Sequence, residues 1–203
     1  MIGTSQTEIC NLALDHIAQR PITIITDPLS TQAIVCNRKW NIALKETLRA
    51  ADWGFARVTV ALAESGTFDP AANGYRYAYV MPVECAALRI IFNAYTTDME
   101  KGEKYERAYD PTNNEELILT DVEDAYAKYT YIVTDVTLFD PSFVTSFGYR
   151  LAAEIVVPLI GKEDTASDMV KLFTSSLSDA ARIGSYEGEQ KTVSPNLFVD
   201  SRG

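Results

Sequence analysis

The sequence predicts a mixed α+β fold: a mainly helical bundle with an inserted antiparallel sheet and an extended C-terminal tail. Apolar residues recur at helical spacing before residue 52 and after residue 140, whereas two-residue alternation dominates the middle of the chain. Helices at both ends can pack together only if the sheet loops out between them. We therefore expect four segments: N-terminal helices in 1–54, the inserted sheet in 55–139, C-terminal helices in 140–188 and the tail in 189–203.

The first segment should contain two helices. Residues 4–19 form the first, because Ser5 and Glu8 have the spacing of a capping box. Residues 20–30 carry proline near each end and β-branched residues between, which predicts an extended connector. The second helix should cover about 31–51. Three cations share one of its faces: Arg38, Lys45 and Arg49.

The middle segment should be a small antiparallel sheet. "YRYAYVM" and "YAKYTYIV" alternate as strands do, and "ALRIIF" and "ELILT" are shorter strand candidates. Trp53 and Phe55 stand where the chain leaves the helices for this sheet. Two aromatic side chains there can bury about 150–250 Å² each, so we interpret them as a hinge that fixes the angle between sheet and bundle. Ordinary core packing is the alternative interpretation.

Helical spacing returns at Asp140, which is placed as an N-cap with a proline directly after it. Pro158 and Gly161 are expected to end this helix. Thr165 and Asp168 again have capping-box spacing, which predicts the start of a last helix that ends at residue 188. The tail has no helical period but carries a short apolar cluster after a proline: Pro195, Leu197, Phe198 and Val199.

The sequence contains no recognisable catalytic, nucleotide-binding or zinc motif, so we expect no catalytic residues, metal or cofactor. His16 is the only histidine, which removes most catalytic triads. Cys10, Cys36 and Cys85 are isolated and are interpreted as buried small apolar residues. A run of carboxylates leaves a solvated acidic loop, a divalent-ion site or a carboxylate-only hydrolase open: Glu115, Glu116, Asp121, Glu123 and Asp124.

The net charge of −10 is unevenly spread, with +1 over residues 1–60 and −11 over residues 61–203. Such a surface cannot wrap DNA, because phosphate binding requires clustered cations. It suits simple solubility, or the wall of a passage that DNA crosses without adhering. We expect neither a membrane segment nor a secretory signal, because no apolar run approaches about 20 residues and no basic-then-apolar start is present.

In order and spacing, these pieces resemble the head–tail connector (adaptor) proteins of short-tailed phages, of the tail tubular protein A type. The resemblance covers about residues 5–188. Its most specific block is "YIVTDVTLFDPSFVTSFGYRLAAEIVVPLIG", in which "FGYR" departs from the smaller residues of the family. "YAYVMPVECAALRI" is a second match, with Met81 and Glu84 as mild departures. The N-terminal pattern is carried by Asn11, Ala13, Leu14, Pro21, Ile22, Cys36, Asn37, Trp40, Trp53, Phe55 and Ala56.

The resemblance implies a structural virion protein at the head–tail junction, made in the host cytoplasm. Its expected partners are further copies of itself in a dodecameric ring, the portal protein, the tail nozzle protein and tail fibres, with DNA passing through the channel without specific binding. In that setting the cationic face of Arg38, Lys45 and Arg49 would meet a neighbouring subunit, and the tail with Leu197–Val199 would dock on the portal. Alternatives are a head-completion stopper protein, or a non-viral ligand-binding domain or enzyme with its site in the sheet.

Overall fold

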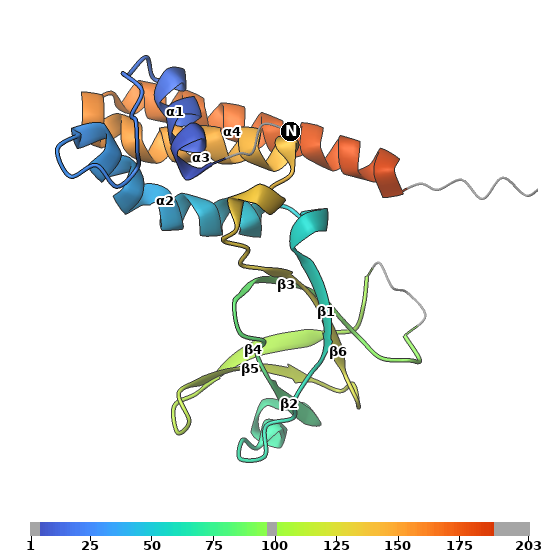
Figure 1. Cartoon of the computed structure of the whole chain (residues 1–203). Helices are drawn as coiled ribbons and strands as arrows, with labels where there is room; N and C mark the ends of the chain where they lie inside the picture. Colours follow the sequence, from blue (N-terminus) through green and yellow to red (C-terminus); the bar gives the residue numbers. More distant parts are fainter. Residues whose placement is uncertain (1–4, 97–100, 189–203) are drawn as a thin grey trace, which may run out of the picture.

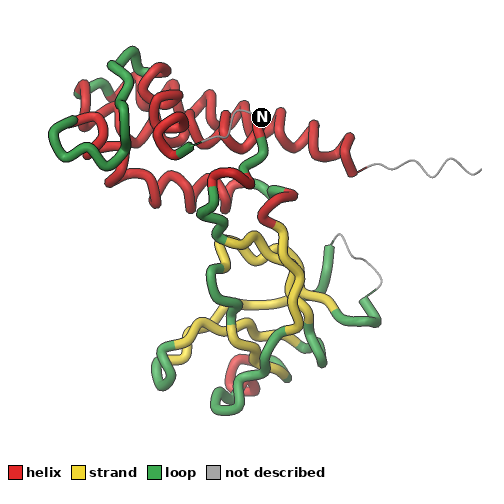
Figure 2. The backbone as a smooth tube through the Cα atoms, viewed as in Figure 1, coloured by secondary structure: helices red, strands yellow, loops and turns green. Residues whose placement is uncertain are grey.

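The computed structural model describes residues 5–96 and 101–188 and confirms a mixed α+β fold, with four α-helices and two small antiparallel sheets in that part of the chain. The helices form one layer and the strands lie below it (Figures 1 and 2). The helices are α1 (Gln6–His16), α2 (Thr31–Ala50), α3 (Pro141–Ile160) and α4 (Glu163–Gly188). The strands are β1 (Arg57–Ala61), β2 (Tyr77–Val80), β3 (Cys85–Phe92), β4 (Tyr105–Asp110), β5 (Glu115–Thr120) and β6 (Tyr126–Tyr131). Short 3-10 turns are η1 (Gly54–Ala56), η2 (Pro70–Asn73) and η3 (Val136–Leu138).

The predicted cap of the first helix is confirmed. The Glu8 backbone N–H donates to Ser5 Oγ at 3.1 Å, and the Ser5 N–H donates to Glu8 Oε2 at 2.7 Å. Residues 20–30 are not the simple extended connector that we expected, because a turn forms where Asp27 N donates to Ile24 O at 3.3 Å. This turn lets the short connector reverse the chain between two helices that both pack on the same core.

The end of α3 agrees with the prediction at Gly161 but not at Pro158. Asp140 caps the helix as expected, since its Oδ1 accepts from Ser142 N at 2.7 Å. Pro158 lies inside the helix and does not end it. So close to the end, a proline removes one backbone donor from an exposed turn, and the Gly161 N–H still donates to Val157 O at 2.9 Å. Gly161, with φ of 69°, is the residue that turns the chain.

The prediction that Thr165 and Asp168 form a second capping box at the start of α4 is wrong. Helix α4 already begins at Glu163, two residues after the turn at Gly161. Glu163 and Asp164 place negative charge in the first turn, where the helix dipole favours it. The helix runs to Gly188, as the sequence predicts.

The strands form two sheets, not the single sheet that the sequence suggested. Their orders are β1-β6-β3 and β2-β5-β4, and every pairing is antiparallel. Backbone hydrogen bonds join the two sheets at both edges, from Val80 N to Ala63 O at 2.8 Å and from Glu103 N to Ile91 O at 2.7 Å. The segments that adjoin β1 and β4 therefore satisfy part of the exposed edges of β2 and β3.

Side chains from both sheets share an apolar core. Its fully buried members include Ile91 of β3, Ile118 of β5 and Ala127 of β6. Gly102 belongs to the crossing between the sheets: its φ is +67°, and a Cβ there would lie 2.3 Å from Ile90 Cγ2. Only glycine fits such a backbone conformation at so close an approach.

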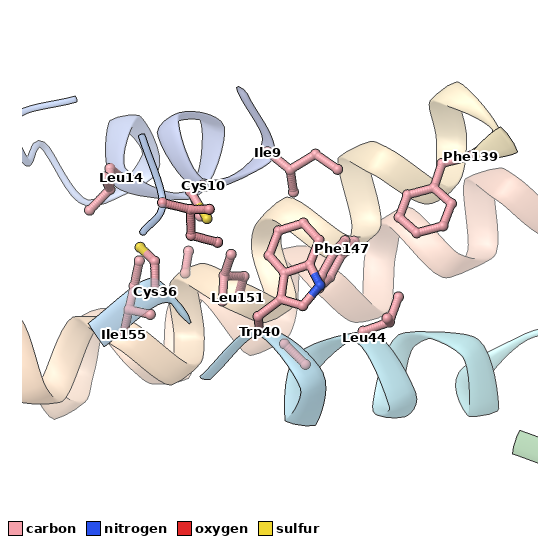
Figure 3. Packing of buried hydrophobic residues seen from close by; sticks show 14 of the residues in the cluster. Ile9, Cys10, Leu14, Cys36, Trp40, Leu44, Phe139, Phe147, Leu151 and Ile155 are labelled. Carbon is pink, nitrogen blue, oxygen red and sulfur yellow. The ribbon is translucent and has the colours of Figure 1, made fainter. Parts of the chain in front are cut away.

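Helix α3 is the centre of the helical layer and packs against α1, α2 and α4. Aromatic rings line the contact with α2: Trp40 meets Phe147 edge-on at 4.7 Å between ring centroids (Figure 3). By length and mean hydropathy (1.4) alone, α3 is the one helix in the described part of the chain that could cross a membrane. Half of its apolar window is buried by the other helices, as is typical of the central helix of a bundle.

Candidate functional site

The junction between helices and strands is the most elaborate polar and aromatic site in the structure. The chain leaves the helical layer after α2 and returns through η3 into α3. Trp53 is buried there, and its indole N–H donates to Thr47 O at 2.8 Å. Its ring meets Phe143 edge-on at 5.0 Å, so the outgoing chain is fixed both to the end of α2 and to the start of α3.

Phe55 extends the same contact. Its ring lies 5.0 Å from Phe143 and 5.6 Å from Phe139, and Phe139 and Phe143 are themselves 4.7 Å apart. Edge-on aromatic pairs of this kind add about 0.5–1.5 kcal/mol each beyond burial. The two aromatics singled out in the sequence therefore lie together, at the point where outgoing and returning chains meet.

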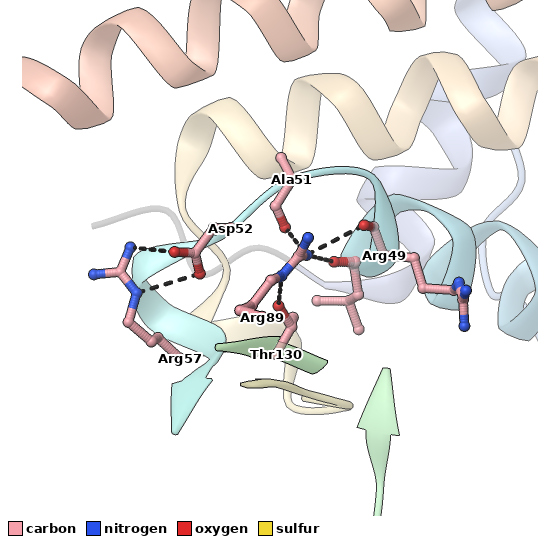
Figure 4. Close-up of polar contacts among 7 residues, drawn as sticks. Arg49, Ala51, Asp52, Arg57, Arg89 and Thr130 are labelled. Carbon is pink, nitrogen blue, oxygen red and sulfur yellow. Dashed lines mark hydrogen bonds and ion pairs between the residues drawn. The ribbon is translucent and has the colours of Figure 1, made fainter. Parts of the chain in front are cut away.

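Arg89 of β3 is the junction residue that sequence reasoning missed. Its Nη2 donates to Leu48 O at 3.1 Å and Arg49 O at 3.2 Å, and also to Ala51 O (Figure 4). Its Nε donates to Thr130 Oγ1 at 2.9 Å. The last carbonyls of a helix lack intrahelical donors and carry partial negative charge, so a guanidinium satisfies and stabilises them.

The end of α2 explains why this arginine is needed. Ala51 has extended backbone angles, and no glycine follows to cap the helix. Burial lowers the pKa of Arg89, while nearby Asp52 opposes this shift. One signal in the sequence could have identified Arg89: it is the only charged residue within the apolar run "ALRIIF". A charge in a half-buried strand needs a partner.

Two more arginines complete the junction (Figure 4). Arg49 Nη1 donates across to Ala86 O of β3 at 3.2 Å. Arg57 forms a forked contact with Asp52, with hydrogen bonds of 3.2 and 2.9 Å. Both members of that pair are exposed, so it contributes little energy by itself. Together, the polar contacts link α2 directly to β3 and to the segment that enters β1.

The cationic face of α2 is only partly free. Arg38 and Lys45 are exposed and form no ion pair within residues 5–96 and 101–188. Arg49, the third member of the expected interface, already contacts the sheet. A groove of about 630 Å³ adjoins Arg38, and it is lined by Arg38, Lys39, Ile42, Ala153, Glu154, Val157 and Pro158.

An ion network holds the other side of this groove. Lys39 Nζ lies 3.0 Å from Glu154 Oε2, and Arg150 Nη2 lies 2.8 Å from Glu154 Oε1. Arg150 also contacts Glu46. These contacts bridge α2 and α3 at the surface beside the groove.

The described residues contain no candidate metal centre. No group of three or more His, Cys, Asp or Glu side chains there could hold a metal ion. His16 stacks on Tyr149 at 4.4 Å between ring centroids, and its Nε2 is buried without a described hydrogen-bond partner. Burial lowers the pKa of His16, so the ring is held neutral for packing.

The cysteines have packing roles as well. Cys10 and Cys36 are buried and face each other between α1 and α2 (Figure 3). The hydrogen bond between them, followed by burial, raises the pKa of Cys10, so this thiol stays protonated. Cys85 is only half-buried, and burial raises the pKa of its thiol too. The contact with Cys10 lowers the pKa of Cys36, but this thiol is buried, whereas a reactive cysteine combines a lowered pKa with access to solvent.

A shallow groove of about 470 Å³ between the sheets is a place that suits the alternative of a site in the sheet. Its lining includes Cys85 and the glutamates 84, 115 and 116. Glu116 is paired with Arg107 at 2.7 Å. The groove thus offers carboxylates beside a thiol whose pKa is raised by burial.

Several residues of the resemblance have structural partners. Asn11 and Ile22, which are 11 residues apart, exchange two hydrogen bonds of 3.0 and 2.7 Å, and these bonds attach the connector to α1.

The tail residues Pro195, Leu197, Phe198 and Val199 lie outside the described residues. No protein-family model matches the chain, and no curated protein matches it.

Proposed function

We propose that this chain is a structural virion protein that forms the ring-shaped adaptor between portal and tail nozzle and lines the DNA ejection channel. The proposal rests first on the ordered resemblance of residues 5–188 to head–tail connector proteins. One structural observation supports it: the sheets are tied to the helices by Arg89, Arg49 and the Trp53–Phe143 contact.

A fixed angle between two parts of a subunit matters in a ring. Identical head-to-tail contacts close into a ring only if each subunit repeats the same rotation, and otherwise they form an open helix. Trp53 and Phe55 would hold this angle through aromatic packing, and Arg89 would hold it through hydrogen bonds to the end of α2. In this proposal the four helices act as one bundle, and the sheets form an inserted domain.

The charge distribution is consistent with a channel. Residues 61–203 carry a net charge of −11, which would repel DNA phosphates and let DNA slide. We expect the channel surface to be acidic or neutral overall. A channel lined mainly by lysine and arginine in an assembled structure would contradict this proposal.

We also propose that the tail, residues 189–203, docks on the portal through Leu197, Phe198 and Val199. Each apolar side chain contributes about 1.5–3 kcal/mol when fully buried, although ordering the polar residues offsets much of this gain. A weak anchor repeated around a ring gains strength by avidity. The opposing hypothesis is a terminus with no partner.

Electron microscopy of the purified protein tests the proposal most directly, because rings support a connector and a monomer at every concentration favours the ligand-binding or stopper alternatives. We further propose that the protein has no enzymatic activity. Metal-dependent DNA cleavage that disappears in Asp121→Asn or Glu123→Gln would refute this second proposal.

A further inference from the structure

Two exposed helical stripes of opposite charge stand out on the helical layer. Each stripe mixes large apolar side chains with charged ones at helical spacing. The first, the α2 stripe, consists of Ile34, Arg38, Ile42 and Lys45. The second, the α4 stripe, consists of Asp168, Leu172, Asp179 and Ile183.

The apolar members of both stripes are unusually open to solvent. Ile34 and Ile42 are each 48% exposed, Leu172 is 43% exposed and Ile183 is 45% exposed. Isoleucine and leucine at this exposure gain free energy when another surface covers them. Ile42 also lines the groove beside α3, whose apolar wall continues through Val157, itself 42% exposed.

The charged members make the stripes complementary. The α2 stripe carries only cations and the α4 stripe only carboxylates among its charged residues. Asp168 and Asp179 already pair with Lys171 and Arg182 one turn away. All four of these side chains are at least 64% exposed, so the local pairs are weak and can exchange for intermolecular ones.

The spacing of the stripes also agrees. Arg38 and Ile42 are four residues apart, and so are Asp168 and Leu172. If the two helices run parallel, Arg38 can therefore lie beside Asp168 while Ile42 lies beside Leu172. If the helices run antiparallel, Ile34 can lie beside Ile183 while Arg38 lies beside Asp179. In either direction Arg38 faces an aspartate and one apolar pair forms, whereas Lys45 lies opposite Ser175 or Leu172 in these registers.

We propose that the α2 stripe of one subunit binds the α4 stripe of a second copy of this chain. The inference rests on the proposed ring and names the surfaces that build it. Helices α2 and α4 each pack on α3, so the two stripes are different surfaces of one subunit and can be occupied by two different neighbours. Such a heterologous contact is the kind that generates rings.

Charge reversal with rescue tests the contact. Arg38→Glu/Lys45→Glu should raise the concentration needed for half-assembly about tenfold or more, because it sets a carboxylate at position 38 against Asp168 or Asp179 and makes the α2 stripe negative. Adding Asp168→Lys/Asp179→Lys to the same chain should restore assembly. The matched control is Arg20→Glu/Arg76→Glu, which changes net charge equally but lies off both stripes and should assemble as the parent does.

Assembly is measured for the full chain by mass photometry and negative-stain electron microscopy, with circular dichroism to check that each variant is folded. Normal assembly of the Arg38/Lys45 variant overturns the stripe contact and leaves the ring itself intact. Loss of assembly without rescue by the α4 changes also overturns it, because another partner surface is then involved. A parent protein that never assembles refutes the ring, and the contact with it.

Discussion

Replacing Arg89 by alanine should loosen the attachment of the sheets to the helices. The substitution removes hydrogen bonds to the carbonyls of Leu48, Arg49 and Ala51 and to Thr130 Oγ1. Hydrogen bonds from a charged donor contribute about 1.5–3 kcal/mol each, but such effects are not additive. Water can also reach the half-exposed carbonyls after the change. We therefore expect the free energy of unfolding to fall by about 2–3 kcal/mol in total.

Urea unfolding followed by circular dichroism measures this loss. The chain has two tryptophans, so fluorescence in a Trp40→Phe background reports on Trp53 at the junction alone. Hydrogen exchange should also become faster in the last turn of α2. Arg89→Lys keeps the charge but not the forked geometry, and we expect an intermediate loss.

Arg107→Ala is the matched control, because Arg107 lies on β4 and makes one exposed ion pair with Glu116. Its effect should stay within about 1 kcal/mol. If Arg89→Ala costs no more than this control and leaves Trp53 fluorescence unchanged, the guanidinium does not hold the junction.

Three further predictions concern the proposed hinge, the buried histidine and the proposed tail anchor. Trp53→Ala should cost about 3–5 kcal/mol and also impair portal binding; a variant that folds and binds as the parent does would exclude the hinge role. Because burial lowers the pKa of His16 in the folded state, stability should fall as pH drops below the unfolded value of about 6.5, and His16→Gln should flatten that part of a urea-unfolding series. Deleting residues 189–203 should weaken pull-down of the portal and lower virion yield; unchanged values for both would rule out the anchor.

Local signals in the sequence predicted much of the fold. Caps are hydrogen bonds between residues two or three positions apart, so Ser5 and Asp140 could be identified without tertiary knowledge. Where two local signals lay close together, the prediction was less accurate: both Pro158 and Gly161 were expected to end the helix, and only Gly161 does so. The capping-box spacing at Thr165 did not mark a helix start, because α4 begins earlier, at Glu163, two residues after the turn at Gly161.

The strand region shows the limit of periodicity. Two-residue alternation indicated β2 and β6, because the two faces of a strand differ in burial, and short apolar runs indicated β3 and β5. It did not indicate β4, whose "YERAYD" is largely exposed and carries charges on both faces. Periodicity also could not predict the division into two sheets, because the pairing of strand edges depends on which segments meet in the folded chain.

By itself, the sequence determined the helical ends of the chain, the strand-rich middle and the position of Trp53 and Phe55 at the exit between them. Only the tertiary structure decided how the parts are joined. Arg89 is about 40 residues from the carbonyls that it contacts, and its local sequence does not identify these partners. Local hydrogen bonds and periodicity are encoded within a few residues, whereas this junction exists only after the chain has folded back on itself.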